Sequence, residues 1–400
     1  MIVIPKLNKK SYDSPKSFRP IILLNTIGKL IKKVIGERLQ FNTVSNNFIH
    51  LSQLGSLKFK STINAGVALT HAIWTGWVKN LTTSTLAFNI TQFFPLLNHQ
   101  LLSLIIKKTG FNQCISSFFA DYLVNRKINY SWNNFSSPMF NINVRVGQGS
   151  VLSPILFTLY LSPFIYILEN RLKNLKIPTL FISFIDDSLF ISQSNSIDIS
   201  NSCLYYSYNV LTNLLEKFGL VVKHSKTEIF YFNRSHKVFN PPPLDLSPLG
   251  GNILLPSNTW KYLGFIFDRK LTFHQHVDFY ANKAISMVKY MKLLSNSSHS
   301  INPLQKCLLY RSCILPITLY RFQLWFYNCA PTAYYIKTLN KMQRYAAIWI
   351  LSTFKTSPSY SVKAITGLIP IKLHLQKLGG RSQLWVYKLP HNHLLHSLIE

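Results

Sequence analysis

The chain has 400 residues, of which 43 are Lys or Arg and only 13 are Asp or Glu, which gives a formal net charge of +30. Hydrophobic residues make up 48% and aromatic residues 14%, which excludes a disordered basic tail and indicates a folded, strongly cationic protein of two or three domains. Such a surface typically binds a polyanion, either nucleic acid or an anionic membrane.

The cysteines and one apolar stretch bear on the compartment. Five cysteines are present and no two of them have CxxC spacing, which indicates reduced thiols in an intracellular protein rather than disulfides or a zinc cluster. Residues 151–168 are apolar enough to suggest a membrane span. They include Pro154 and Pro163, however, and the polar residues 147–150 precede them, so a buried helix is favoured.

Helical and strand patterns alternate along the first two thirds of the chain. Apolar residues recur at helical spacing over residues 27–39, where Asn25 or Thr26 is placed to cap the helix. The later patterns predict, in order, a strand at 84–90, a helix from Pro95 to Lys108, a helix at 114–124, a β-like segment before Val144, the apolar helix, a hairpin around residue 186, a helix at 201–218 and a strand at 226–232. This order is typical of a small mixed sheet with helices on one face.

The last part of the chain has a different pattern. Residues 233–256 include three consecutive prolines and are predicted to form a loop. One hairpin follows at residues 260–267, and the remainder is predicted to be mostly helical.

Asp186 and Asp187 stand side by side within an apolar run, although carboxylates are scarce in this chain. Their neighbours are mostly β-branched or aromatic, which predicts two short strands with the aspartates at the bend. Two carboxylates at a hairpin tip suit a hard divalent cation such as Mg²⁺, which prefers oxygen ligands. The alternative is a solvated turn in which the aspartates make local hydrogen bonds.

Asn89 falls at the exit of the strand predicted at residues 84–90. In a small mixed sheet of this order, that exit and the tip of the aspartate hairpin would be neighbours. This is the geometry of two-metal phosphoryl transfer, in which two cations hold the attacking and the leaving oxygens.

Seven motifs along the chain carry a family resemblance. They are residues 16–26 (KSFRPIILLNT), 55–62 (GSLKFKST), 86–95 (LAFNITQFFP), 147–154 (GQGSVLSP), 184–187 (FIDD), 219–228 (GL to KTE) and 260–264 (WKYLG), with a further likeness between residues 356 and 370. Their order and spacing resemble the reverse transcriptase of non-LTR (LINE-type) retrotransposons, and within these the fungal Tad-like group is the most similar. The resemblance covers nearly the whole chain.

The resemblance implies an α+β fold of the right-hand polymerase type. Residues 1–84 would be N-terminally truncated fingers, residues 85–235 a palm with a ferredoxin-like sheet and inserted finger helices, residues 236–345 a linker and thumb, and residues 346–400 a helical C-terminal extension. The implied partners are an RNA template, a DNA primer or target, and deoxynucleoside triphosphates. The implied cofactor is a pair of Mg²⁺ ions, for which Mn²⁺ can substitute. The life cycle of such elements implies a nuclear location without membrane attachment.

The family also implies catalytic roles. Asp186 would bind the catalytic Mg²⁺ and Asp187 would support the same site, while Lys226 matches a lysine associated with protonation of the pyrophosphate leaving group. Asn89 stands where the family has an aspartate that bridges both metals. An amide keeps one oxygen ligand but lacks the negative charge, so the rate should fall by several powers of ten.

Five residues match positions around the incoming nucleotide. Phe94 corresponds to the aromatic side chain that excludes a 2′-hydroxyl, and Gln148 and Gly149 correspond to residues that pack against nucleotide and template. Arg19 and Lys60 match cationic finger positions near the triphosphate. Without the resemblance, Phe94 would be interpreted as ordinary core and the two cations as solvated surface.

The last third of the chain contains a hairpin motif and a pair of histidines. Tyr262, Leu263 and Gly264 match the hairpin that grips the primer end. His274 and His276 are interpreted as a surface pair rather than a zinc site, because no cysteine or carboxylate stands at ligand spacing.

Three functions remain open on the sequence. The first is an RNA-directed DNA polymerase, and the second is a non-catalytic nucleic-acid-binding remnant of the same fold, disabled at Asn89. Both predict salt-sensitive binding to RNA and DNA, so only polymerisation separates them. The third is a membrane-associated cationic protein, which rests on the apolar stretch and a mean hydropathy of +0.13 and is opposed by the ordered motifs.

Overall fold

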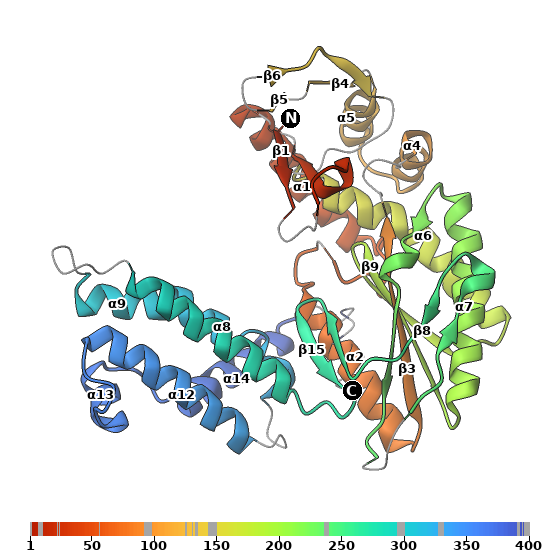
Figure 1. Cartoon of the computed structure of the whole chain (residues 1–400). Helices are drawn as coiled ribbons and strands as arrows, with labels where there is room; N and C mark the ends of the chain where they lie inside the picture. Colours follow the sequence, from red (N-terminus) through yellow and green to blue (C-terminus); the bar gives the residue numbers. More distant parts are fainter. Residues whose placement is uncertain are drawn as a thin grey trace. The chain divides into compact units, whose positions relative to one another are not determined.

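The computed structural model describes residues 2–6, 11–21, 23, 25–55, 57–91, 98–124, 126–129, 131–132, 135–142, 150–235, 240–293, 301–326, 332–389, 393 and 395. The chain divides into two compact units, whose elements are labelled in Figure 1. Unit 1 comprises Met1–Ala65, Asn80–Ile229 and Asn240–Pro256, and unit 2 comprises Gly66–Lys79, Phe230–Phe239 and Ser257–Glu400. The limits of fingers, palm and thumb given above stay predictions.

Unit 1 is built around a sheet that has five strands in the described part of the chain, the last of which continues into unit 2 at Phe230. Its order is β10-β3-β9-β8, with β11 also paired to β3. The strands are β3 (Thr82–Thr91), β8 (Thr179–Phe184), β9 (Asp187–Ser194), β10 (Val221–Val222) and β11 (Glu228–Phe232). The strand predicted at 84–90, the hairpin around residue 186 and the strand at 226–232 are thereby confirmed.

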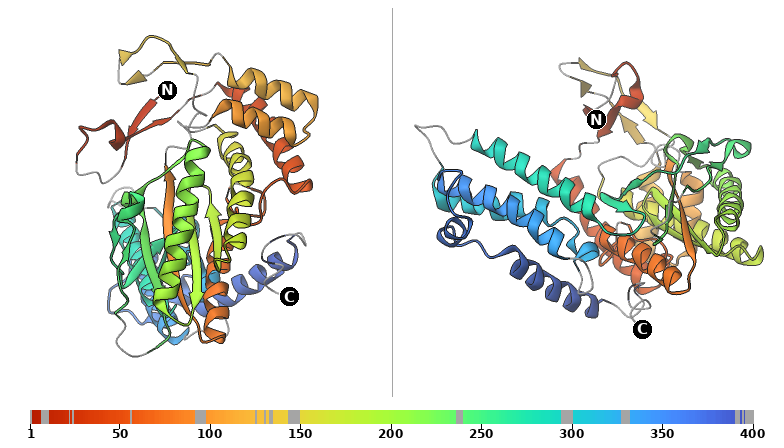
Figure 2. Two further views of the ribbon diagram at one scale, coloured as in Figure 1. Left: turned by 90° about the vertical axis from the view of Figure 1, so that its right-hand side faces the viewer. Right: turned by 60° about the horizontal axis from the view of Figure 1, so that its bottom comes forward.

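Helices α6 (Ser153–Asn174) and α7 (Ile197–Lys217) accompany this sheet (Figures 1 and 2). α7 packs against β3 and β9, and α6 packs beside α7. The ring of Phe88 on β3 lies 5.4 Å from that of Phe190 on β9 and 5.9 Å from that of Tyr208 on α7, between ring centroids. The core of unit 1 therefore lies between the sheet and its helices, as the order of elements predicts.

The apolar stretch that suggested a membrane span belongs to α6. Pro154 occupies the first turn of this helix, Pro163 lies within it, and most side chains from Ser153 to Leu172 are buried. Within the described ranges, no helix combines the length and the apolar character needed to cross a membrane. The prediction of a buried helix is confirmed.

The other helices of unit 1 follow their sequence signals. α1 (Thr26–Ser45) is capped by Asn25, whose Oδ1 accepts a hydrogen bond from the Gly28 N–H at 2.6 Å. α4 (His99–Lys108) ends where the sequence predicts, α5 (Gln113–Leu123) packs against it, and α2 (Thr62–Val78) continues into unit 2. α4 begins at His99 because Asn98 caps it there; residues 92–97, where the sequence predicts the start, lie outside the described part.

Of the short strands in this unit, the first two escaped sequence prediction. β1 (Ile2–Pro5) and β2 (Phe18–Ile21) pair antiparallel, joined by a chain that includes the one-turn helix η1 (Pro15–Ser17). The predicted β-like segment contains β4 (Arg126–Ile128), β5 (Ser131–Trp132), β6 (Phe135–Ser136) and β7 (Phe140–Ile142). The segment predicted as a loop at 233–256 carries β12 (Leu244–Asp245), the one-turn helix η3 (Ser247–Leu249) and β13 (Ile253–Leu254), so that prediction was wrong in part.

Unit 2 begins its main part with the predicted hairpin and continues in helices. The hairpin consists of β14 (Thr259–Tyr262) and β15 (Phe265–Asp268). The helical elements are α8 (His274–Lys292), α9 (Pro303–Leu309), the π-helical turn η4 (Tyr310–Ile314), α10 (Leu315–Thr318), α11 (Phe322–Trp325), α12 (Thr332–Leu351), α13 (Ser359–Ile365) and α14 (Ile371–Tyr387). α8 and α12 lie side by side, with Ala284, Val288, Met342 and Ala346 buried in their shared core (Figures 1 and 2).

Candidate active site

The two aspartates lie at the tip of the hairpin formed by β8 and β9. β8 ends at Phe184, Ile185 and Asp186 make the turn, and Asp187 is the first residue of β9, paired with Phe184. The prediction that the aspartates lie at a bend between two strands is confirmed. Asp186 is exposed and Asp187 is half-buried, so the tip carries two adjacent carboxylates at the surface of unit 1.

Asn89 lies directly opposite Asp187 on the neighbouring strand β3. Its Nδ2 donates a hydrogen bond to Asp187 Oδ1, and the Ile90 N–H donates to the carbonyl oxygen of Asp186 at 2.9 Å. The strand exit and the hairpin tip are therefore neighbours, as the sequence predicts. The amide nitrogen, which an aspartate would not have, serves here to bind Asp187.

The surroundings of the tip make both carboxylates harder to ionise than ordinary aspartates. Desolvation by the surrounding protein raises the pKa of Asp186, against the opposing effects of its own main-chain N–H and the Lys226 charge. Desolvation, and then the negative charge of Asp186, raise the pKa of Asp187 to about 6, against the hydrogen bond from Asn89 and the Lys226 charge. A cation at the tip would favour the ionised form of both groups.

Lys226 ends the one-turn helix η2 (His224–Lys226), between β10 and β11. The adjacent Lys223 donates its main-chain N–H to the carbonyl oxygen of Asn89 at 2.9 Å, which ties this turn to the end of β3. The Lys226 side chain is exposed, and its charge acts on both aspartates. The structure thus groups the four residues that the sequence predicts as catalytic at one end of the sheet.

The donor set at this end of the sheet can be compared with the needs of a divalent cation. Asp186 and Asp187 supply the hard carboxylate oxygens that Mg²⁺ and Mn²⁺ accept. Among the residues that the structure describes, no group of three or more His, Cys, Asp or Glu side chains could hold a metal. Asn89 adds only a neutral oxygen, so these residues fit one divalent cation better than the two that phosphoryl transfer uses.

The residues predicted around the nucleotide are described only in part. Arg19 is exposed on β2, opposite Ile4 of β1. Lys60 is partly buried, and its Nζ donates to the main-chain oxygen of Gln53 at 2.8 Å. Burial lowers the pKa of Lys60 to about 8. Phe94, Gln148 and Gly149 lie outside the described residues.

The residues predicted to grip the primer form the turn between β14 and β15 in unit 2. Tyr262 is buried at the end of β14, and Leu263 and Gly264 have φ angles of 48° and 83°. A Cβ on Gly264 would lie 2.8 Å from the hydroxyl of Tyr320, so both the backbone angle and the space require glycine. The Tyr280 hydroxyl donates to the Gly264 carbonyl oxygen at 2.7 Å.

His276 is not the surface residue that the sequence suggests. It is 1% exposed, beneath the β14–β15 turn, and its Nδ1 accepts from the Ile266 N–H at 3.2 Å. Its Nε2 pairs with the carbonyl oxygen of Tyr320 at 3.1 Å. The imidazole therefore joins the hairpin to the helical part of unit 2, and the interpretation as a surface pair was wrong for this residue.

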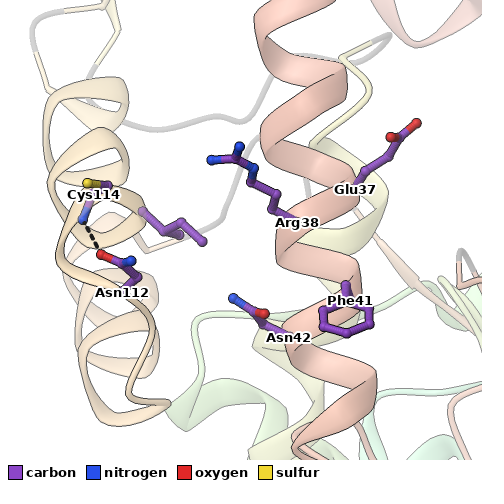
Figure 3. A pocket seen from close by; sticks show the side chains of 7 residues that line it. Glu37, Arg38, Phe41, Asn42, Asn112 and Cys114 are labelled. Atoms are coloured by element: carbon purple, nitrogen blue, oxygen red, sulfur yellow. Dashed lines mark hydrogen bonds between the residues drawn. The ribbon is translucent and has the colours of Figure 1, made fainter.

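A hollow of about 420 Å³ lies between α1 and α5 (Figure 3). In Figure 3, Arg38 extends from α1 toward α5, where the Cys114 N–H donates to Asn112 Oδ1 at 3.1 Å. The lining side chains are Glu37, Arg38, Phe41, Asn42, Asn112, Cys114 and Ile115. None of the residues predicted for catalysis or nucleotide binding is among them.

The fold and the aspartate hairpin agree with the family to which the chain is similar. Residues 4–267 match the model of the family described as reverse transcriptase (RNA-dependent DNA polymerase). This match spans more than half of the chain, which therefore belongs to the reverse transcriptase family. The predicted right-hand polymerase fold is confirmed by this membership. Enzymes of the family generally use divalent metal ions and bind a nucleic-acid template.

The curated relatives come from mobile elements. "Probable RNA-directed DNA polymerase from transposon BS" of Drosophila melanogaster is 26% identical over 322 residues, covering 79% of this chain and 34% of that protein. "Retrovirus-related Pol polyprotein from type-1 retrotransposable element R1" of Bradysia coprophila is 21% identical over 389 residues, covering 96% of this chain and 37% of that protein. The chain is thus similar to the reverse transcriptases of such elements and spans about a third of the length of these relatives.

Similar solved structures are telomerases. The telomerase of Candida albicans, in complex with a fragment of telomeric RNA, has a TM-score of 0.46 at 12% identity, covering 91% of this chain and 62% of that one. An apo telomerase of Candida tropicalis, truncated from the C-terminal domain, has a TM-score of 0.41 at 15% identity, covering 60% and 43%.

Proposed function

We propose that this domain adds deoxynucleotides to the 3′-hydroxyl of a DNA primer, with RNA as the template and Mg²⁺ as the cofactor. The cluster of Asp186, Asp187, Asn89 and Lys226 at one end of the sheet is the observation that supports this reaction. Bound Mg²⁺ would supply activation of the hydroxyl and neutralisation of the charge that develops on the transferred phosphoryl group. Membership in the reverse transcriptase family supports the same reaction class.

The residues of the cluster have different tasks in this proposal. Asp186 and Asp187 hold the cation, and the turn between β8 and β9 keeps the two carboxylates adjacent. Lys226 is exposed beside them, where its ammonium group meets the pyrophosphate and donates a proton as it leaves. Asn89 orients Asp187 through its Nδ2 rather than holding a second cation.

The family resemblance extends the proposal to the substrate contacts. Arg19 and Lys60 would contact the triphosphate, and Tyr262–Gly264 the primer end. Lys60 donates to the Gln53 carbonyl oxygen, and its ammonium group has two further N–H donors for phosphate oxygens. The remaining contacts are proposed for Phe94, Gln148 and Gly149, on the likeness of their motifs alone.

Asn89 makes slow catalysis the expected state of this chain. Replacing a metal-bridging carboxylate by an amide removes one negative charge from the site, and the Nδ2 of Asn89 already engages an oxygen of Asp187. By analogy with other catalytic electrostatic groups, the cost is about 10²–10³-fold in rate. Mn²⁺, which binds the same oxygen ligands, should sustain more of the activity than Mg²⁺.

A second candidate function is binding of nucleic acid without catalysis. Two observations favour it: the bond from Asn89 to Asp187, and the charge of unit 2. Residues 279–399 contain 15 Lys and Arg and no Asp or Glu, so this part of the chain is uniformly cationic. A surface of that kind binds the phosphates of RNA and DNA with strong salt dependence whether or not polymerisation occurs.

Primer extension separates the two candidates. Wild type, Asn89→Asp and Asp186→Ala are compared on an oligo(dT) primer annealed to poly(rA), with Mg²⁺ and with Mn²⁺. We expect weak extension by wild type that Asp186→Ala abolishes, and a gain of about 10²–10³-fold in Asn89→Asp. Silence from wild type with recovery in Asn89→Asp would establish the binding remnant. Silence from both, with intact binding of the duplex by fluorescence anisotropy, would contradict the polymerase proposal.

The closer affiliation and the location are also proposed from the resemblance. We propose that the chain groups with the fungal Tad-like elements, which a tree of reverse transcriptase domains tests; a firm place among the Drosophila jockey-like relatives would contradict it. We propose action in the nucleus without membrane attachment. Exclusion of a fluorescent fusion from nuclei would contradict that location.

A further inference from the structure

We propose that Gln53 is a positioning residue of the aspartate hairpin. In this proposal, which rests on the proposed function of Asp186 and Asp187, its buried side-chain amide holds the tip of the hairpin so that both carboxylates meet one cation. Gln53 lies 130 residues before Ser183 of the hairpin in the sequence, and none of the seven motifs includes it.

The tip that Gln53 holds has an unfavourable backbone conformation. Ile185, the first residue of the turn, has a φ of 58°, in the left-handed region that a β-branched side chain rarely adopts. Such a conformation persists only where the surroundings impose it. The position of the next two residues, which are the aspartates, depends directly on this angle.

The side chain of Gln53 supplies hydrogen bonds that impose this conformation on Ile185. Its Oε1 accepts from the Ile185 N–H at 3.2 Å and from the Gly55 N–H at 3.3 Å. Its Nε2 lies 3.5 Å from the hydroxyl oxygen of Ser183, which in turn donates to the Ile185 carbonyl oxygen at 3.1 Å. Gln53 is 0% exposed, so these bonds form without competition from water.

The hairpin also packs directly against the main chain beside Gln53. A Cβ on Gly55 would lie 2.5 Å from Ile185 Cγ1 and 2.7 Å from Ile185 N, so only glycine fits there. The Leu54 N–H donates to the Ser183 carbonyl oxygen at 2.8 Å, and the Ser183 N–H donates to Ser52 at 2.9 Å. Residues 52–55 therefore run along β8 as a short strap, up to the turn.

This strap is fixed on its far side as well. Its anchor is Glu169 of α6. The Ser52 hydroxyl donates to Glu169 Oε1 at 2.8 Å, and His50 Nε2 lies 3.3 Å from Glu169 Oε2. Lys60 Nζ holds the Gln53 carbonyl oxygen at 2.8 Å. Gln53 thus links the buried helix α6, through the strap, to the tip that carries the aspartates, which is how supporting residues of metal ligands act.

Hydrogen exchange and binding of Mn²⁺ alone test this role without polymerase activity. Gln53→Met keeps the length of the side chain but removes its acceptor and donor. Gln53→Glu keeps the Oε1 acceptor. The matched control is Gln343→Met in unit 2, because Gln343 is also a buried glutamine, 1% exposed, that donates to a main-chain oxygen, Ile369 O, at 2.8 Å.

We expect faster exchange of the 184–187 amides and about tenfold weaker Mn²⁺ binding in Gln53→Met. Gln53→Glu should keep the exchange protection, and Gln343→Met should leave both readouts at wild-type values. Unchanged hairpin exchange in Gln53→Met, or an equal change in Gln343→Met, would overturn the proposal.

Wild type alone also decides the matter where Gln53→Met does not fold. Slow exchange of the Ile185 amide is expected, and rapid exchange would overturn the role of Gln53. Failure of the proposed function has a separate signature. In that case Asp186→Ala leaves Mn²⁺ binding unchanged, while the exchange of the hairpin amides still follows Gln53.

Discussion

The buried imidazole of His276 should make the stability of unit 2 depend on pH. Its Nδ1 accepts from the Ile266 N–H and its Nε2 must donate to the Tyr320 carbonyl oxygen, so the folded state requires the neutral ring with its proton on Nε2. A proton on Nδ1 would break the bond from Ile266. It would also place a charge in a site that is 1% exposed.

The sign and size follow from the pKa of His276. Burial lowers it from 6.5 to about 4, against the opposing effect of the Tyr320 carbonyl. Because the folded-state pKa lies below the unfolded one, the stabilisation is fully present above pH 6.5 and is lost as the pH falls towards 4. The whole difference amounts to about 3 kcal/mol of unfolding free energy, of which about 2 kcal/mol is lost between pH 7 and pH 5.

Tryptophan fluorescence during urea unfolding is suited to the measurement, because six of the seven tryptophans belong to unit 2: Trp74, Trp77, Trp260, Trp325, Trp349 and Trp385. We expect the wild-type unfolding free energy to fall by about 2 kcal/mol from pH 7 to pH 5. His276→Gln keeps a donor and an acceptor but cannot be protonated, so its loss should be much smaller. His374, whose pKa burial also lowers, titrates in both proteins and cancels in the comparison.

Equal losses in wild type and His276→Gln would refute this reasoning, because the pH dependence would then come from other groups. A wild type that becomes more stable as the pH falls would refute it too. That outcome would require the imidazole to gain, rather than lose, interactions on protonation.

Two further predictions concern backbone positions. Gly264→Ala should destabilise unit 2 by about 1–3 kcal/mol, because the φ angle is unfavourable for alanine and the new Cβ meets Tyr320. A Cβ at Gly367 meets nothing within 4 Å, so Gly367→Ala should cost less. Urea unfolding followed by tryptophan fluorescence compares the two variants, and equal costs would contradict the argument. Asn98→Ala removes two capping bonds of α4, at 2.9 and 3.1 Å, and should cost about 1 kcal/mol, seen as faster amide exchange in the first turn. Asn112→Ala removes one such bond from α5, at 3.1 Å, and an effect as large as that of Asn98→Ala would count against the cap assignment.

The site residues that could be predicted from the sequence are those whose chemical character differs from that of their neighbours in the chain. Asp186 and Asp187 interrupt an apolar run in a chain with few acids, so the hairpin and its tip follow from local pattern alone. The opposition of Asn89 to Asp187 followed from the order of elements, which is that of a small mixed sheet whose strand exit and hairpin tip are neighbours. The cap at Asn25 is equally local.

The parts that escaped prediction act over long sequence distances or through burial. Gln53 meets Ile185 across 132 positions, and a glutamine beside Leu54 and Gly55 gives no local sign of it. His276 alternates with polar residues at the start of a helix, so its burial beneath the β14–β15 turn is set by tertiary packing. The strands β1 and β2 are short and contain proline, which weakens any strand pattern.

Asn89 and an aspartate at the same position would affect this site differently. The Nδ2 of Asn89 donates a hydrogen bond to Asp187, whereas a carboxylate at this position would add repulsion beside Asp186 and Asp187. Without a cation, an aspartate at this position would therefore cost stability, and only metal binding would return it. We infer that Asn89→Asp should lower the free energy of unfolding in EDTA. Added Mn²⁺ should then raise that free energy more in Asn89→Asp than in wild type. An equal rise in the two proteins would contradict this argument.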